Sequence, residues 1–222
     1  MYAGTRIFAS NLNPKMAQRF YHYILLDAVR ADIEANKRLN YHYYMSLKKA
    51  VYKPAAFFKG IVLPLCQQES YCTLREAAII ASVLQRVSIP VHHSAVALHK
   101  LATTICSTEA NATTTTTTES YNGATSIFIK TLLNKKYALP APVIGVLVTY
   151  FTSFTNHRDS LPVLWHQALL CFVQRYKNEV QDEARESLRL LMKAQSHPLI
   201  TPEIRRELFG VQAWKEEREG LP

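Results

Sequence analysis

Glycine is scarce in this sequence, which has only six among 222 residues. An average protein contains about 7% glycine, and the tight turns of β-hairpins depend on it because they require positive φ angles. A sheet protein built from hairpins is therefore not expected. Apolar residues make up 48% and charged residues 19%, a composition typical of a folded globular protein.

Cysteines and long apolar runs are also sparse. The four cysteines, at positions 66, 72, 106 and 171, include no Cys-x-x-Cys pair, so a zinc ribbon is not indicated. So few cysteines are typical of a reducing compartment and not of a disulfide scaffold. The longest apolar run, residues 142–151, is far shorter than the ~20 residues of a membrane helix, and no secretory signal is visible. The sequence therefore predicts no membrane partner.

The motifs of common enzyme and metal sites are missing. The sequence contains no Gly-x-x-x-x-Gly-Lys phosphate loop, no Gly-x-Gly-x-x-Gly and no Gly-x-Ser-x-Gly. A helix that binds zinc usually presents histidines at positions i and i+4 together with a carboxylate or a thiolate. His92, His93 and His99 lack that spacing, and their segment has no acidic residue. We therefore expect no metal site.

The remaining candidates for chemistry are isolated side chains. His166 follows a tryptophan inside a helical pattern, and we expect a partly buried histidine with its hydrogen bonds satisfied. Cys66 and Cys171 lie in apolar surroundings, which favours core packing over a role as a nucleophile. The sequence thus predicts neither an enzyme nor a cofactor nor a small-molecule substrate.

Signals for helices are frequent. Asn13 and Thr201 are N-cap residues followed directly by proline, and Thr73 with Glu76 matches the capping-box pattern. Apolar residues recur at steps of three and four between these signals, and prolines lie at the joints. The pattern predicts helices near residues 14–36, 41–52, 54–63, 73–87, 92–106, 123–135, 141–154, 161–178, 181–194 and 202–209.

About ten helices with short links predict an all-α fold. Stacked antiparallel helix pairs, as in an α-solenoid or HEAT-like array, are the expected arrangement, although no clean repeat is present. We expect a single helical domain over residues 1–222. One segment interrupts it, because residues 113–118 are six consecutive threonines that bury too little apolar surface to become ordered. A mobile surface loop is predicted at about residues 107–121.

Positive charge is concentrated in one half of the chain. Residues 1–106 contain 13 Lys and Arg against 5 Asp and Glu, whereas residues 107–222 contain 13 against 12. The whole chain carries a net charge of +9. A positive field confined to one half favours an acidic partner there, such as RNA, an acidic protein segment or a membrane surface.

The segment 37–59 is the most basic part of this half, and aromatic residues are interleaved with its cations. Lysines suit phosphates, and aromatic rings can stack on bases. The alternative is that the aromatic side chains belong to the core while the lysines are ordinary surface groups, and we prefer that alternative for the aromatic residues. The candidate contacts for RNA or an acidic partner are Lys37, Arg38, Lys48, Lys49, Lys53 and Lys59.

Two further charged groups have structural explanations. Lys130, Lys135 and Lys136 end a predicted helix, where cations complement the helix dipole. The acidic residues of the second half alternate with basic ones, as Glu186 does with Arg189, which is typical of a solvated helix face.

Several long segments resemble the C-terminal half of the bystin family of eukaryotic ribosome-assembly factors. The resemblance extends over nearly the whole chain, with departures at Ala55 and Phe57, where the family usually has Gly and Trp, and at His92, where Leu is common. The Thr-rich segment is an insertion. The matching segments are TRIFASNL (5–12), MAQRFY (16–21), LKKAVYKPAAFFKGIVLPLC (47–66), CTLREA (72–77), SIPVHHSAVAL (88–98), NGATSIFIKTLLNKKYALP (122–140), LPVLWHQALLCFVQRYK (161–177) and TPEIRREL (201–208).

The resemblance implies a non-catalytic scaffold for processing of precursor ribosomal RNA and for maturation and export of the small-subunit precursor (pre-40S). Its implied partners are that particle, its precursor rRNA and small nucleolar RNA, ribosomal proteins of the beak, and an export-linked assembly factor. The implied location is the nucleolus and nucleus, with shuttling to the cytoplasm. Family members carry a long charged N-terminal region, so we expect this chain to begin inside the helical domain.

A second function remains open. The chain would then be a protein–protein adaptor without direct RNA contact, a class that includes cell-adhesion adaptors. A groove rich in exposed aromatic residues and flanked by arginine would favour it. An enzyme on an unrecognised helical site would need His, Cys and carboxylate side chains to converge in one pocket.

Overall fold

The computed structural model describes residues 1–67, 72–110, 121–157 and 159–219. Within these residues all regular structure is helical and no strand occurs, which confirms the predicted all-α class. The chain divides into two compact units, residues 1–101 and residues 102–222, and each is described by itself.

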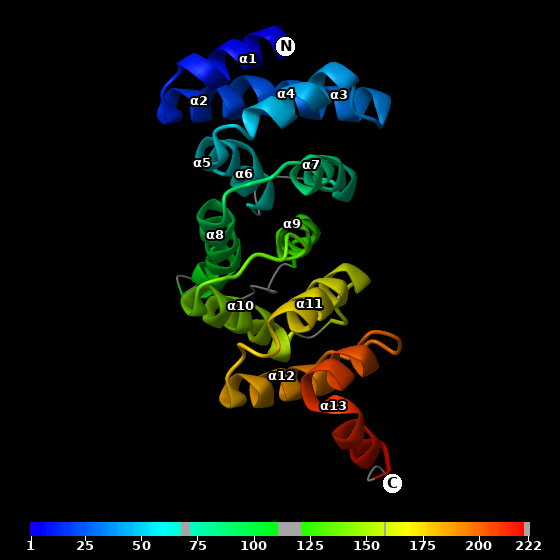
Figure 1. Cartoon of the computed structure of the whole chain (residues 1–222). Helices are drawn as coiled ribbons and strands as arrows, with labels where there is room; N and C mark the ends of the chain where they lie inside the picture. The colour runs from blue at the N-terminus through cyan, green and yellow to red at the C-terminus, as the bar shows by residue number, and fades with distance from the viewer. Residues whose placement is uncertain (68–71, 111–120, 158, 220–222) are drawn as a thin grey trace. The chain divides into compact units, whose positions relative to one another are not determined.

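The first unit contains seven α-helices, the first part of an eighth, and two π-helical segments, η1 and η2 (Figure 1). α1 packs on α4, α2 packs on α5, and η1 packs on η2. The elements are α1 (Tyr2–Asn11), α2 (Pro14–Phe20), η1 (Tyr21–Leu26), α3 (Asp27–Asn36), α4 (Tyr41–Ala50), α5 (Pro54–Phe57), η2 (Phe58–Val62), α6 (Leu63–Cys66), α7 (Leu74–Arg86) and α8 (Val91–Ala110).

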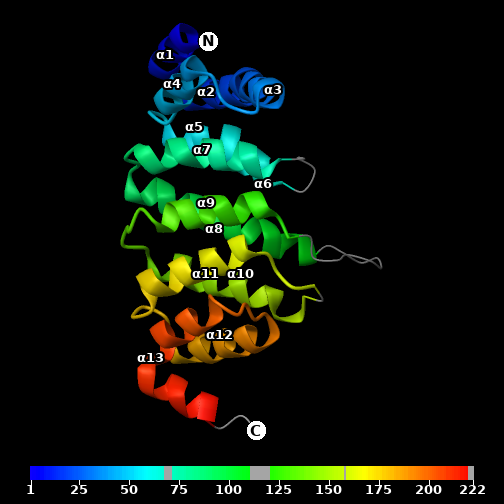
Figure 2. The same cartoon turned by 90° about the vertical axis from the view of Figure 1, so that its right-hand side faces the viewer.

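The second unit begins within α8. Each later helix packs on the helix two positions further along the chain. α9 packs on α11, α10 on α12, and α11 on α13; Figures 1 and 2 both show α9 beside α11. These helices are α9 (Gly123–Leu133), α10 (Ala141–Ser153), the short 3₁₀ helix η3 (Phe154–Asn156), α11 (Val163–Tyr176), α12 (Asp182–Ala194) and α13 (Thr201–Glu219).

Two of the three expected helix starts are confirmed. The Asn13 side chain accepts a hydrogen bond from the Met16 backbone N–H at 2.8 Å, and Pro14 is the first helical residue. Thr73 and Glu76 form the capping box at the start of α7. Thr201 was expected to cap the last helix and instead is its first residue, with its hydroxyl accepting from the backbone N–H of His197 at 2.8 Å.

The predicted helix near 14–36 is continuous, but its turns widen to π-helix in the middle. The same happens in the helix expected near 54–63. The widened turns face one another, and Gly60 lies where they meet: a Cβ added there would lie 2.8 Å from the Gln18 carbonyl oxygen and 3.2 Å from the Tyr21 Cβ. Only glycine allows this approach.

The core of the second unit is aromatic. Trp165 and Phe172 on α11 pack with Phe151 on α10, at ring-centroid distances of 5.8 and 5.5 Å from it. Phe154 of η3 lies 5.8 Å from the Trp165 ring, and all four side chains are at most 2% exposed. Edge-to-face and tilted pairs at these distances add to the stability gained from burying the rings.

Two helices differ from those expected from the sequence. Residues 2–11 form α1, a helix that the apolar periodicity had not indicated. Most of the loop predicted at residues 107–121 falls at 111–120, outside the described residues, while α8 extends to Ala110, past the end expected at residue 106.

Candidate functional site

The six basic residues predicted to contact a partner all lie in the first unit, in α4, in η2 and in the links before and after α4. Lys37 follows α3 with a left-handed backbone, and Arg38 lies in the next link. Lys48 and Lys49 are in the last turn of α4. The remaining two are Lys53, just before α5, and Lys59, in η2. Lys37, Arg38, Lys48 and Lys59 are exposed, and Lys49 and Lys53 are half-buried.

Two of these cations are held by the protein itself. The Lys53 ammonium donates a hydrogen bond to the backbone carbonyl of Leu12, the residue that ends α1. This bond ties the end of α1 to the start of α5, so Lys53 has a structural role. Lys49 Nζ lies 4.9 Å from the centre of the Tyr52 ring, a cation–π pair at the surface.

The aromatic residues of the same segment divide between core and surface. Phe57 and Phe58 are buried, as the core interpretation predicted. Tyr41 and Tyr52 are each 68% exposed, so that interpretation is wrong for them. Exposed tyrosines next to lysines are available in this unit to stack on nucleic-acid bases.

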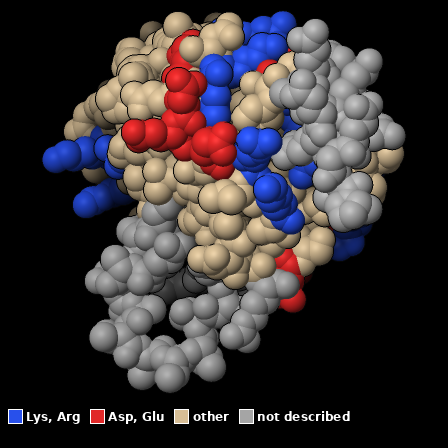
Figure 3. All heavy atoms as spheres, turned by 90° about the horizontal axis from the view of Figure 1, so that it is seen from below, with Lys and Arg blue, Asp and Glu red and all other residues tan. Residues whose placement is uncertain are grey.

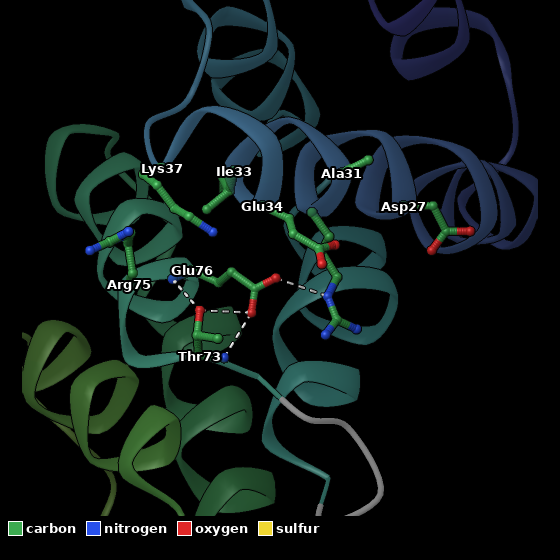
Figure 4. Close-up of a pocket in the computed structure, with 9 residues that line it drawn as sticks. Asp27, Ala31, Ile33, Glu34, Lys37, Thr73, Arg75 and Glu76 are labelled. Carbon is green, nitrogen blue, oxygen red and sulfur yellow. Dashed lines mark hydrogen bonds and ion pairs between the residues drawn. The ribbon is translucent and has the colours of Figure 1, made fainter.

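A cavity of about 810 Å³ lies between α3 and the start of α7 (Figure 4). Lys37 lines one end of it, and its wall carries both signs of charge. The lining residues are Asp27, Arg30, Ala31, Ile33, Glu34, Lys37, Thr73, Arg75 and Glu76.

The buried carboxylate of this cavity is fully engaged (Figure 4). Glu76 accepts from the Thr73 backbone N–H at 2.7 Å and from the Thr73 hydroxyl at 3.0 Å, and its other oxygen accepts from Arg30 Nε at 3.1 Å. Its side chain is 8% exposed. A carboxylate held by three donors is not placed to act as a general base, so Glu76 secures α3 to α7.

A second, smaller cavity of about 330 Å³ lies beside the two π-helical segments. Its described lining is polar and basic: Gln18, Arg19, His22, Tyr23, Lys59, Pro64 and Gln67. Among the predicted residues only Lys59 belongs to it. Three other lining residues could have been grouped from the sequence. Arg19, His22 and Tyr23 are spaced by three and four positions, so they share one face of a helix.

No group of three or more His, Cys, Asp or Glu residues in the described part of the chain is arranged to hold a metal ion. Cys66 and Cys171 are buried, as expected, and burial raises the pKa of the Cys171 thiol. Raising the pKa lowers the thiolate fraction and makes this cysteine a poor nucleophile. Within the described residues no helix is both long and apolar enough to cross a bilayer.

His166 differs from the expectation of a partly buried, satisfied histidine. It is 1% exposed, and its Nδ1 has no hydrogen-bond partner among the described residues. Burial, together with the neighbouring His197 ring 5.3 Å away, lowers its pKa. A buried imidazole kept neutral in this way belongs to the core of the second unit.

Of the three lysines expected at the end of a helix, Lys130 lies in the last turn of α9, while Lys135 and Lys136 follow its end. Lys130 donates from Nζ to the Gln167 side chain at 2.7 Å and so links α9 to α11. On α12, Arg189 lies 3.6 Å from Glu186 in an i, i+3 pair. The face of the molecule in Figure 3 carries acidic side chains beside basic ones.

Comparison with known proteins gives one consistent family. The family model described as Bystin matches residues 1–218. Proteins named Bystin from Monosiga brevicollis and Homo sapiens are 51% and 50% identical to the chain over 219 and 208 residues. These alignments cover 99% and 94% of this chain but 49% and 44% of the relatives. Bystin of Arabidopsis thaliana is 49% identical, over 94% of this chain and 43% of the relative. The chain therefore spans about half the length of the curated relatives it matches, and none of these names denotes an enzyme.

Proposed function

The chain belongs to the bystin family, and on this premise we propose that it is a non-catalytic assembly factor of the small ribosomal subunit. It acts as a scaffold on the pre-40S particle during processing of precursor rRNA, and its other partners are beak ribosomal proteins and an export-linked assembly factor. It works in the nucleolus and nucleus and travels to the cytoplasm with the particle. The observation that carries the proposal is the set of exposed cations in the first unit.

Three of these cations have no competing role in the described structure. Lys37, Arg38 and Lys48 are exposed, and none takes part in an ion pair or side-chain hydrogen bond with the described residues. Such cations are available to replace the counterions of a phosphate backbone. By contrast, Lys53 is bonded to Leu12 and is removed from the proposed contact set.

We propose that the helices of this chain form stacked antiparallel pairs. Support comes from the second unit, in which α9, α11 and α13 pack in succession and α10 packs on α12. An α-solenoid typically has two layers of helices, and within each layer a helix packs on the helix two positions later in the chain.

The test replaces Lys37, Arg38 and Lys48 by Glu in one variant, which reverses their charges. A matched control reverses Lys136, Arg175 and Lys193, three exposed cations of the second unit; Lys136 shares the left-handed backbone of Lys37, with φ of 58° against 57°. We expect the first variant to lose co-sedimentation with small-subunit precursors and the control to retain it. Equal retention by both variants would refute the RNA-facing role of the first unit.

A protein–protein adaptor is the second candidate, and one observation favours it. Ile7 and Phe8 on α1 are 56% and 38% exposed, and Met16 on α2 is 45% exposed. Exposed apolar side chains on neighbouring helices are typical of a docking surface. If Ile7→Ser with Met16→Ser abolished precursor association while the triple charge reversal did not, the adaptor function would replace direct RNA contact.

A further inference from the structure

The smaller cavity is built where the two π-helical segments pack together. Gly60 of η2 sits against the backbone of Gln18 and the Cβ of Tyr21, so that no side chain separates the two segments. This approach brings Lys59, next to Gly60 in the chain, to the same cavity as Arg19, which precedes η1 by two residues. π-Helical turns are rare and occur frequently at functional sites.

The cavity is positively charged. Arg19 and Lys59 line it and are both exposed, and its described lining includes no Asp or Glu. Neither cation forms an ion pair with a described residue. Two cations beside one cavity, neither paired with a described acidic residue, favour an anionic ligand.

Two aromatic rings complete the lining. His22 Nδ1 lies 3.3 Å from the Gly60 carbonyl oxygen, and because that oxygen only accepts, Nδ1 carries the proton and the ring is held in place. The Tyr23 ring lies 4.7 Å from the His22 ring, and the Tyr23 side chain is 68% exposed. An exposed tyrosine held beside two cations is the combination that binds single-stranded nucleic acid, in which bases stack on the ring and phosphates contact the cations.

We propose that this cavity binds a nucleotide of single-stranded RNA. Arg19 and Lys59 contact the phosphate, and Tyr23 stacks on the base. The volume of about 330 Å³ is at the lower end of ordinary ligand pockets, which suits one nucleotide and not a duplex. The inference rests on the proposed function and deepens it, because it adds Arg19 and Tyr23, which lie outside the basic segment 37–59, to the RNA contacts.

The experiment measures binding of a fluorescent 12-nucleotide single-stranded RNA to the full chain by anisotropy, between 50 and 200 mM salt. Arg19→Gln with Lys59→Gln should lower the slope of log K against log salt by about 0.7, since both cations contact one phosphate and each neutralised phosphate of a single strand contributes about 0.7. Tyr23→Ala should weaken binding by about fivefold to 150-fold without changing that slope. The same RNA with abasic positions should erase the effect of Tyr23→Ala.

Ile24→Ala is the matched control, because Ile24 follows Tyr23 in η1, is 50% exposed and is not among the described residues that line the cavity. It should leave the affinity unchanged. Thermal melts of every variant should coincide with that of the parent chain, since all the replaced side chains are exposed.

Failure of the cavity and failure of the proposed function give different results. If the Arg19/Lys59 and Tyr23 variants bind RNA like the parent chain while reversal of Lys37, Arg38 and Lys48 weakens binding, the cavity inference is wrong and the proposed function stands. If the parent chain binds no RNA at 50 mM salt, both are wrong. If polyglutamate displaces the RNA and Tyr23→Ala has no effect, the cavity takes an acidic peptide and the nucleotide inference is overturned.

Discussion

Replacement of Gly60 by alanine tests the packing on which the smaller cavity depends. The added Cβ would lie 2.8 Å from the Gln18 carbonyl oxygen, whereas ordinary contacts begin near 3.4 Å. The backbone of η2 at Gly60 and that of α2 at Gln18 must therefore separate by about 0.6 Å. The nearest atom belongs to the backbone of α2, so no side chain can swing aside to make room.

The magnitude follows from two opposing effects. Overpacking of a close contact lowers the free energy of unfolding by about 1–3 kcal/mol, whereas alanine in place of glycine in a helix raises it by about 1 kcal/mol. Gly60→Ala should therefore lower the free energy of unfolding by about 0–2 kcal/mol. Gly145→Ala, in α10, adds a Cβ with nothing within 4 Å and should be neutral or stabilising by up to about 1 kcal/mol.

Urea unfolding followed by circular dichroism measures both variants. The informative quantity is their difference, about 1–3 kcal/mol in favour of Gly145→Ala, because the helix-propensity effect cancels in it. Gly4→Ala provides a second control inside the first unit, again with nothing within 4 Å of the added Cβ. A Gly60→Ala protein as stable as both controls would refute the close approach of η2 to Gln18 and Tyr21.

Two further predictions concern the interior. Because burial lowers the pKa of His166 in the folded chain, the unfolded chain takes up a proton first as the pH falls through about 6.5, so the free energy of unfolding should decrease below that pH by up to about 1.4 kcal/mol per pH unit. Urea titrations between pH 5.5 and 7.5 should show a flatter pH dependence in His166→Phe, and an unchanged slope would contradict the assignment. Glu76→Ala removes the side-chain acceptor of the Thr73 N–H and the acceptor of Arg30 Nε, and should cost about 2–4 kcal/mol by urea unfolding. Glu34→Ala, an exposed carboxylate of the same cavity, should change the stability by less than about 0.5 kcal/mol, and equal losses in the two variants would contradict the role of Glu76.

Much of the fold could be predicted from short-range patterns. The helix that begins at Pro14 and the capping box at Thr73 are local, because the groups that form each hydrogen bond lie three residues apart. The widened turns at Tyr21–Leu26 and Phe58–Val62 could not be predicted in this way, because apolar periodicity continues through them. They pack against one another near Gly60, whose nearest neighbours, Gln18 and Tyr21, are distant in the sequence.

The candidate site shows the same division. Composition located the excess of positive charge in the first half, and that half contains every cation proposed to contact RNA. It did not distinguish Lys53, which is bonded to a carbonyl 41 residues away, from Lys48, which is exposed. Arg19 and Tyr23 could be assigned to the site only from the tertiary structure, in which they line the same cavity as Lys59.

By itself, the sequence determined the all-α class, the capped starts of the helices at Pro14 and Leu74, the uneven charge and the bystin resemblance. Each depends on composition or on residues that are neighbours in the chain. Tertiary structure alone decided that Glu76 binds Arg30 across 46 residues and that His22 binds Gly60 across 38. The physical reason is that such contacts depend on how closely two helices approach, and side-chain packing along both helices sets that distance.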